Sequence, residues 1–305
     1  MPFLTVALLI FSAGPVQAED LVVGLYTPNL DFADGVARNG YVSKVADALS
    51  SGTGDTWSGR AYARRGDFES ALKSGELDVV VVDPAWFGAR GGTLKAVASL
   101  TASGRSARAM YVFVKPGSAT SIHQLKGQRI AIPDVPLMDD LLTGDVLGGE
   151  VDAGSFFGAV DRVKDVRAAR NAVELDKADA FLAWDGYGDG FAALYSTADV
   201  PLPVVAIAGK LGSSTESEIR SAVRGMSASG ANLVSGASSY SSSDMRRFKA
   251  AASRKQRTRR PELMAPADIE LSVGRLGNVK SGDGDLRPTR AADAFVLPRV
   301  EEAAP

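Results

Sequence analysis

Acidic and aromatic side chains follow the apolar runs of this sequence at positions where they could bind a ligand. Asp83 comes directly after Val79–Val82, and Trp184 and Asp185 come directly after the apolar run at residues 180–183, within the predicted strand 179–183. Carboxylates pair with cations, and tryptophan and tyrosine rings attract cations to their faces, so this combination suits a cationic or amine-bearing solute. The same rings could instead be core residues, and the aspartates could be helix N-caps. The candidate ligand-binding residues are Tyr26, Thr27, Asn29, Asp83, Trp86, Asp134, Met138, Trp184, Asp185 and Tyr187.

The residue types offer little for catalysis. The chain has no cysteine and a single histidine, His123. A thiol nucleophile, a disulfide, a thiolate metal site and a lipoprotein anchor are therefore excluded, and a catalytic triad or a His-based zinc site would have to be built around His123. We expect this residue to lie on an exposed helical turn. Gly24 lacks the following glycines of a dinucleotide-binding fingerprint. We therefore expect a protein that binds a ligand without a cofactor or metal, and not an enzyme.

Length and composition are those of a globular protein with room for two domains. The chain has 305 residues, 45% of them hydrophobic, and a formal net charge of −2. This charge gives no reason to expect nucleic acid or an anionic membrane as the main partner. Residues 3–11 are apolar and small residues precede Glu19, so we interpret residues 1–18 as a signal peptide, the alternative being a buried strand or short helix. No later segment is apolar for long enough to span a membrane.

The elements that would position these side chains are clearest around Asp83. Asp67 is expected to cap a short helix that ends at Gly75, a residue able to take the left-handed conformation. Val79–Val82 has no polar alternation, which predicts a strand buried on both faces, as in a parallel α/β sheet. Pro84 can occupy the first position of a helix, so a second helix is expected at the carboxyl end of this strand. In open α/β sheets that edge is where ligands bind.

The rest of the chain shows strand and helix patterns in two groups. Residues 165–184 overlay residues 67–86 without a gap and share Asp, Ala, Glu-Leu-Asp and Ala-Trp with them. This match suggests two lobes, each with a helix that leads into a strand whose end carries tryptophan. The other predicted strands are residues 21–26, 60–64, 94–100, 109–115, 129–133, 155–160 and 203–208; the other predicted helices are residues 36–49, 122–125, 137–142 and 215–226; and residues 235–243 are a predicted loop.

Three stretches of the sequence together resemble a known family. They are residues 70–87 (SALKSGELDVVVVDPAWF), 125–133 (LKGQRIAIP) and 172–180 (AVELDKADA). Their order and spacing over residues 21–235 resemble the phosphate/phosphite/phosphonate substrate-binding proteins of ABC transporters. The resemblance implies an α/β, two-lobed type II periplasmic-binding-protein fold, with a hinge, two crossover strands and a ligand in the interlobe cleft. It also implies that a membrane permease of the ABC transporter recognises the closed form.

The sequence departs from this family in the loop after residues 129–133. Family members have Ser, Thr and Gly there, whose hydroxyl and backbone N–H groups bind an anion. This chain has three aspartates instead, Asp134, Asp139 and Asp140. Carboxylates at a helix start satisfy its dipole internally and would repel a phosphonate, so a dense anion of the phosphate type is not the expected ligand. Arg105 and Arg108, near the first crossover, could pair with an anionic ligand or with the aspartates of the cleft, and solvation at the surface is the default for both.

We expect a periplasmic or secreted, monomeric solute-binding protein that captures a small molecule for an ABC transporter. It would be phosphonate-family-like but have an altered anion loop. The alternative is a ligand-sensing or protein-interaction scaffold of the same fold with a degenerate cleft. The predicted division of the chain is residues 1–18, signal peptide; 19–106, lobe I; 107–209, lobe II; 210–260, C-terminal helices returning to lobe I; and 261–305, irregular tail.

Overall fold

The computed structural model describes residues 20–90, 93–227, 233–243, 245, 246 and 248. The predicted signal peptide, the irregular tail and the end of the predicted C-terminal helical region lie outside these residues. The described chain forms two β-sheets with helices packed on them, and we call the two resulting units lobe I and lobe II.

Lobe I is built on a six-stranded sheet with the order β11-β4-β10-β3-β1-β2. Strand β1 lies parallel to β2 and β3, whereas β10 lies antiparallel to β3 and β4. The strands are β1 (Leu21–Tyr26), β2 (Trp57–Ala61), β3 (Val79–Val82), β4 (Lys95–Thr101), β10 (Val204–Ile207) and β11 (Gly236–Ser239). The helices of this lobe are α1 (Gly35–Thr53), α2 (Arg65–Ser74), α3 (Pro84–Ala89) and α7 (Ser213–Gly225).

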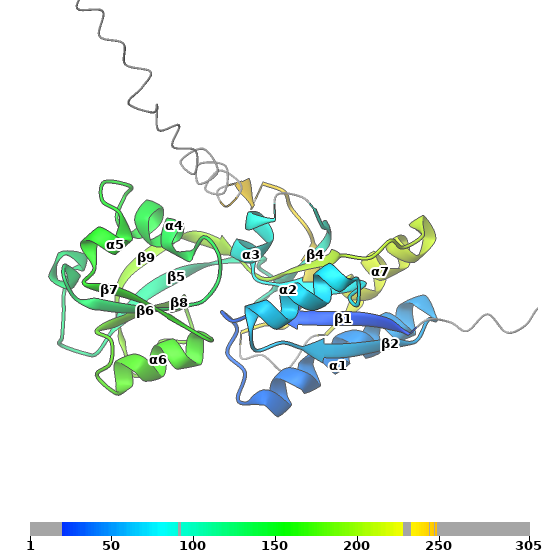
Figure 1. Ribbon diagram of the computed structural model, residues 1–305, viewed down its shortest axis with the longest axis horizontal. Helices are drawn as coiled ribbons and strands as arrows, with labels where there is room; N and C mark the ends of the chain where they lie inside the picture. Colours follow the sequence, from blue (N-terminus) through cyan, green and yellow to red (C-terminus); the bar gives the residue numbers. More distant parts are fainter. Residues whose placement is uncertain (1–19, 91–92, 228–232, 244, 247, 249–305) are drawn as a thin grey trace, which may run out of the picture. The chain divides into compact units, whose positions relative to one another are not determined.

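Lobe II is built on a five-stranded sheet with the order β7-β6-β8-β5-β9. The chain enters this lobe between β4 and β5 and returns to lobe I between β9 and β10 (Figure 1). The strands are β5 (Ala107–Val114), β6 (Arg129–Pro133), β7 (Ala159–Val163), β8 (Ala180–Trp184) and β9 (Ala192–Pro201). The helical segments are η1 (Ile122–Leu125), α4 (Met138–Leu141), the π-helical η2 (Leu142–Val146), α5 (Ala153–Phe156) and α6 (Val166–Glu174).

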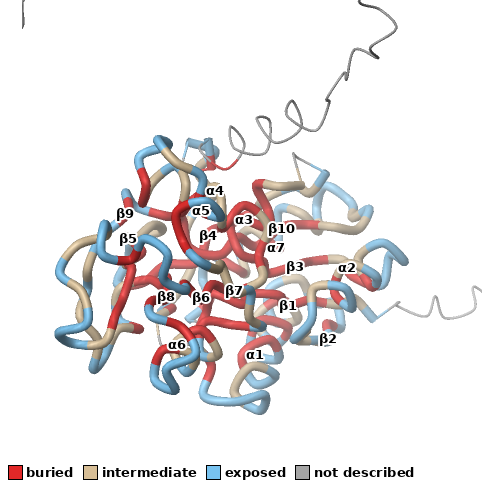
Figure 2. The backbone as a smooth tube through the Cα atoms, turned by 60° about the vertical axis from the view of Figure 1, so that its left-hand side comes forward, coloured by how far each residue is buried: buried red, intermediate tan, exposed pale blue. Residues whose placement is uncertain are grey.

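The core follows the apolar runs of the sequence. All four valines of β3 are 0% exposed, as expected for a strand covered on both faces. Figure 2 shows buried backbone concentrated in the strands of both sheets and exposed backbone in the outer turns. Within the described residues, no helix combines the length and the apolarity needed to cross a bilayer.

The predicted unit around Asp83 is confirmed except at its first residue. Helix α2 ends at Gly75, which has φ 80°, and Pro84 begins α3. The prediction that Asp67 caps α2 is wrong, because the cap position is Arg64 and Asp67 lies inside the first turn. A carboxylate interacts favourably with the positive end of the helix dipole both at the cap position and in the first turn, so the sequence does not distinguish the two positions for Asp67.

Several predicted boundaries are also wrong. The strand predicted at residues 155–160 begins only at Ala159, because the Asp152 side chain accepts a hydrogen bond from the Gly154 N–H and starts α5. The strand predicted at residues 60–64 ends at Ala61. Val36, expected on the buried face of α1, is 80% exposed. Strand β10, inside the predicted span of lobe II, belongs to the lobe I sheet.

Two strands were not predicted, β9 and β11. Strand β9 lies at the edge of its sheet and pairs with β5 alone. Half of its residues are exposed and several are polar, so the sequence shows no apolar strand pattern there. Strand β11 falls in the Ser/Gly-rich segment that was predicted as a loop, and it is held by pairing with β4. The overlay of residues 67–86 on 165–184 also fails at its end, because Trp86 lies in helix α3 whereas Trp184 is the last residue of β8.

Candidate functional site

Parallel strands from both lobes end at one interface. In lobe I, β1 and β3 run in parallel and end at Tyr26 and at the residue before Asp83. In lobe II, β6 and β8 run in parallel and end at Pro133 and Trp184. The Tyr26 hydroxyl donates a hydrogen bond of 3.0 Å to the backbone carbonyl of Asp134, which joins the two sheet edges directly. This is the edge at which open α/β sheets bind ligands.

Asp83 is a fully buried carboxylic acid at this interface. Its Oδ2 accepts a hydrogen bond of 3.1 Å from the backbone N–H of Asn29. The side chain does not cap α3, although Asp83 occupies the cap position of that helix. Burial raises the pKa of Asp83 to about 7, and hydrogen bonding with Asn29 lowers it by less. The carboxyl group is therefore close to half ionised at neutral pH.

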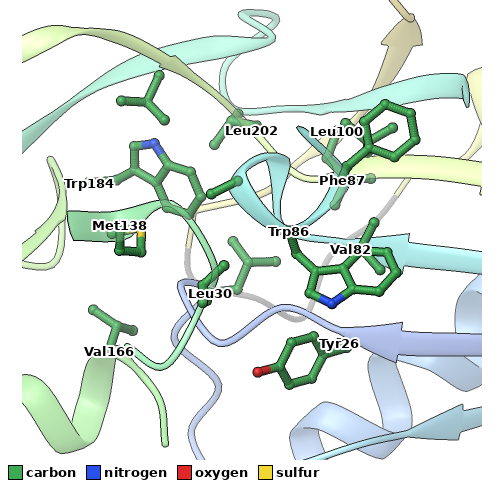
Figure 3. Packing of buried hydrophobic residues seen from close by; sticks show 14 of the residues in the cluster. Tyr26, Leu30, Val82, Trp86, Phe87, Leu100, Met138, Val166, Trp184 and Leu202 are labelled. Carbon is green, nitrogen blue, oxygen red and sulfur yellow. The ribbon is translucent and has the colours of Figure 1, made fainter. Parts of the chain in front are cut away.

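Lobe II places aromatic and sulfur-containing side chains against the same loop of lobe I. Figure 3 shows Trp184 and Met138 near Leu30, and the Asn29 side-chain amide lies 3.8 Å from the Met138 sulfur. The Tyr187 hydroxyl accepts a hydrogen bond of 3.2 Å from the backbone N–H of Asp31. Burial raises the pKa of the Tyr187 hydroxyl well above its usual range, so this group stays protonated.

Several residues of the interface strands and loops carry buried polar atoms without a hydrogen-bond partner. Within the described residues they include Thr27 Oγ1, Asn29 Oδ1, Asp83 Oδ1, Trp184 Nε1 and Asp185 Oδ1. The first four of these residues are at most 5% exposed. An unpaired buried donor or acceptor costs about 1–3 kcal/mol, and such atoms are rare in folded proteins. A cluster of them indicates a place where a bound molecule would supply the missing partners.

Arginines near these atoms are paired with aspartates. Arg65 of lobe I lies 3.2 Å from Asp134 of lobe II. Of the alternatives left open for the two crossover arginines, Arg108 forms an ion pair with the cleft aspartate Asp185, whereas Arg105 forms an exposed pair with Asp199 of β9. In each case the protein neutralises the guanidinium with its own carboxylate, which leaves less positive charge for an anionic ligand.

A second group of contacts joins the lobes through helix α6, and sequence reasoning did not find it. Arg38 of α1 lies 3.2 Å from Asp165, and Arg167 lies 2.9 Å from Asp31. A surface hollow of about 320 Å³ at this contact includes none of the ten predicted site residues. No local pattern distinguishes these charged residues from solvated ones, because their partners are more than 100 residues away in the chain.

The start of helix α6 at the interface already has acceptors for its N–H groups. At α6, the Asp165 side chain accepts a hydrogen bond from the Ala168 N–H over 2.9 Å, and the Pro28 carbonyl of lobe I accepts one from the Val166 N–H over 2.8 Å. Helix α4 carries two acids in its first turn. Helix N-termini favour anions only while their N–H groups are free, so α6 offers little to a phosphonate, and the two acids at the start of α4 oppose one by their charge.

The structure brings nine of the ten predicted residues to the lobe interface or directly behind it. Trp86 lies instead in the core of lobe I, where its indole N–H donates a hydrogen bond of 3.1 Å to Glu69 and its ring packs edge-on against Phe68. Figure 3 shows this ring next to Tyr26 and Val82. Phe68 also stacks on Tyr26, so Phe68 contacts both rings. Trp86 therefore lies behind Tyr26 in the core of lobe I.

Comparison with known proteins identifies the class of protein. Residues 38–254 match the model of a family described as the periplasmic substrate-binding protein of phosphonate ABC transporters. The chain belongs to this family, whose members are solute-binding components of transporters and not enzymes. No curated protein matches the chain by sequence.

Solved structures give the same fold. PhnD1 from Prochlorococcus marinus, in complex with methylphosphonate, has a TM-score of 0.62 and 11% identity, covering 78% of this chain and 99% of that chain. A binding protein component of an ABC phosphonate transporter from Pseudomonas aeruginosa has a TM-score of 0.62 and 11% identity, covering 81% and 91%. A Xanthomonas citri protein bound to ATP has a TM-score of 0.58 and 15% identity, covering 78% and 98%. The predicted type II periplasmic-binding-protein fold is thereby confirmed.

Proposed function

We propose that the protein captures a small solute between lobe I and lobe II and presents it, in the closed form, to an ABC permease. The observation that carries the proposal is the cluster of buried, unpaired polar atoms, because both lobes contribute to it. Thr27, Asn29 and Asp83 belong to lobe I, and Trp184 and Asp185 belong to lobe II. A solute that bonds to both sets would stabilise the closed arrangement and shift an open–closed equilibrium towards it.

The other predicted residues have supporting roles in this proposal. Tyr26, Asp134, Met138 and Tyr187 form direct contacts between the lobes and determine how stable the closed form is without solute. Trp86 holds the Tyr26 side of the site from within the lobe I core. The protein acts as a monomer in the periplasm, to which residues 1–18 direct it.

The two crossovers form the hinge. The Leu202 N–H of the second crossover donates a hydrogen bond of 2.8 Å to the carbonyl of Ser106 in the first. A second bond, also 2.8 Å, runs from the Leu100 N–H to the Pro203 carbonyl. Two adjacent, hydrogen-bonded segments allow the lobes to rotate together about one axis while each sheet remains intact.

Labels on the two lobes test this motion, and the absence of native cysteine makes site-specific labelling simple. Val36 of lobe I and Leu175 of lobe II are 80% and 65% exposed, so Val36→Cys/Leu175→Cys can carry spin labels without disturbing the core. We expect a broad or bimodal distance distribution that narrows when a bound solute is added. The solutes for this test are L-arginine, agmatine, putrescine, inorganic phosphate and methylphosphonate.

A matched pair within one lobe controls for effects of the labels. Val36→Cys/Asp55→Cys places both labels in lobe I, and its distance is expected to stay constant in every condition. An interlobe distance that stays equally constant with all five solutes would contradict solute capture by closure. It would favour instead the scaffold with a degenerate cleft, whose lobes the direct contacts hold together permanently.

A further inference from the structure

We infer that the captured solute is a small cation with several N–H donors, an amine or a guanidine, and not a phosphonate. This inference rests on the proposed function and names the class of solute. It follows from the kind of atom left unpaired and from the charge that surrounds these atoms.

The unpaired atoms are mainly acceptors. Asn29 Oδ1, Asp83 Oδ1 and Asp185 Oδ1 can only accept hydrogen bonds when the two acids are ionised, and Thr27 Oγ1 can accept or donate. Trp184 Nε1 is the donor among the five. A phosphonate has at most one O–H donor near neutral pH and would leave at least two of the three carbonyl and carboxylate oxygens unpaired. An ammonium or guanidinium group supplies three to five N–H donors and satisfies them.

Charge selects the same class of solute. Arg65 and Arg108 are neutralised by Asp134 and Asp185. Asp83 forms no ion pair with any residue that the structure describes, and it is 0% exposed. A buried ionised carboxylate without a cation is unfavourable, and a positively charged solute would remove that penalty. The inferred contact is therefore a charge-assisted hydrogen bond from the solute to Asp83 Oδ1.

Charged groups of both lobes act on Tyr187. Both Asp83 of lobe I and Arg108, the partner of Asp185, influence the pKa of its hydroxyl. The indole N–H of Trp184 has no acceptor in the described part of the chain. A solute that also carries one acceptor group, such as a carboxylate, can therefore form a further hydrogen bond with it.

Isothermal titration calorimetry with the full protein tests the class directly. The probes are L-arginine, agmatine and putrescine as cations, and inorganic phosphate and methylphosphonate as anions. We expect at least one cation to bind and both anions to bind at least about tenfold more weakly. Asp83→Asn, which keeps the shape and removes the charge, is expected to weaken cation binding by about 10- to 100-fold, the effect of losing one charge-assisted hydrogen bond.

Asp55→Asn is the matched control, because Asp55 is exposed in the turn between α1 and β2. The Asp55→Asn variant is expected to bind the cation with the same affinity as the unmodified protein. Circular dichroism of both variants verifies folding. Binding of methylphosphonate or phosphate without any cation would overturn this inference and leave the proposed function standing. Cation binding that Asp83→Asn does not weaken would also overturn it. Binding of no probe, with no change in interlobe distance, would overturn both proposals.

Discussion

The hydroxyl of Tyr26, at the end of the first strand of lobe I, donates a 3.0 Å hydrogen bond to the backbone carbonyl of Asp134 in lobe II. The same ring stacks on Phe68 with a centroid separation of 5.2 Å, so it is fixed on the lobe I side. The bond is therefore made when the lobes meet and is broken when they separate. It connects the stability of the closed form to one hydroxyl group.

Removal of this hydroxyl is expected to open the protein. Tyr26→Phe keeps the stacked ring and loses the interlobe hydrogen bond, which contributes about 1 kcal/mol, so the ratio of closed to open protein should fall about fivefold. The distance between labels at positions 36 and 175 measures the ratio. Tyr41→Phe is the control, because the buried Tyr41 hydroxyl has no hydrogen-bond partner among the described residues. Equal distributions for the two variants would show that the bond does not regulate opening.

Asp83 makes the stability of the protein depend on pH. Its pKa is raised from 3.8 to about 7, so between these values the folded protein holds a proton that the unfolded chain has lost. The free energy of unfolding therefore falls as pH rises from about 4 to about 7 and then levels off, with a loss of at most about 4 kcal/mol. Thermal unfolding is expected to show this decline, and Asp83→Asn should flatten it.

Solute binding is expected to change with pH in the opposite direction. A cation favours ionised Asp83, so its affinity should rise as pH increases towards about 7 and then become constant. The tyrosines whose pKa values Asp83 raises, Tyr26 and Tyr187, remain protonated over this interval. An affinity that is level between pH of about 4 and 7 would argue against a solute contact at Asp83. Further groups acting on these tyrosines are Asp31, Arg65, Glu69, Arg108 and Asp134.

Asp134 is expected to exclude anions. Asp134→Ser removes a carboxylate and frees Arg65, whose guanidinium lies 3.2 Å from it. Each of the two side chains is about two-fifths exposed, so solvent weakens their electrostatic effect on a bound anion. We therefore expect calorimetry to show a gain of about three- to tenfold in affinity for inorganic phosphate. Adding Arg65→Ala to the same variant should cancel the gain. Unchanged phosphate affinity in Asp134→Ser would contradict repulsion as the cause of exclusion.

The packing of β2 against α1 depends on a glycine. A Cβ added at Gly59 would lie 2.7 Å from the backbone carbonyl oxygen of Val42, which cannot move without shifting the helix. Gly59→Ala is therefore expected to destabilise the protein by about 1–3 kcal/mol, measured by urea unfolding. Gly66→Ala meets nothing within 4 Å inside α2 and is expected to be neutral or to stabilise by up to about 1 kcal/mol. Similar stability of both variants would refute the packing argument.

The sequence predicted the elements whose pattern is local. A run of four valines favours a buried strand, Gly75 tolerates the left-handed conformation at a helix end, and Pro84 suits a helix start; all three are found where expected. Strands β9 and β11 were not predicted because they are held by pairing with β5 and β4 and not by an apolar pattern of their own. The match between residues 67–86 and 165–184 suggested two lobes, and the family resemblance implied the same division.

The site was predictable in part for the same reason. Parallel strands end at a common edge, so residues directly after β1, β3, β6 and β8 could be grouped from the sequence. The pairing of Arg65 with Asp134 and of Arg167 with Asp31 could not, because it depends on how the lobes close. Trp86 shows the limit of the argument by strand ends: two residues into α3, its ring turns back to the lobe I core.

A crystal structure of the protein grown with L-arginine tests the central claim most directly. The account predicts arginine between the lobes, with a guanidinium nitrogen within about 3.2 Å of Asp83 Oδ1. An interface that stays free of solute while arginine binds elsewhere on the surface would contradict it.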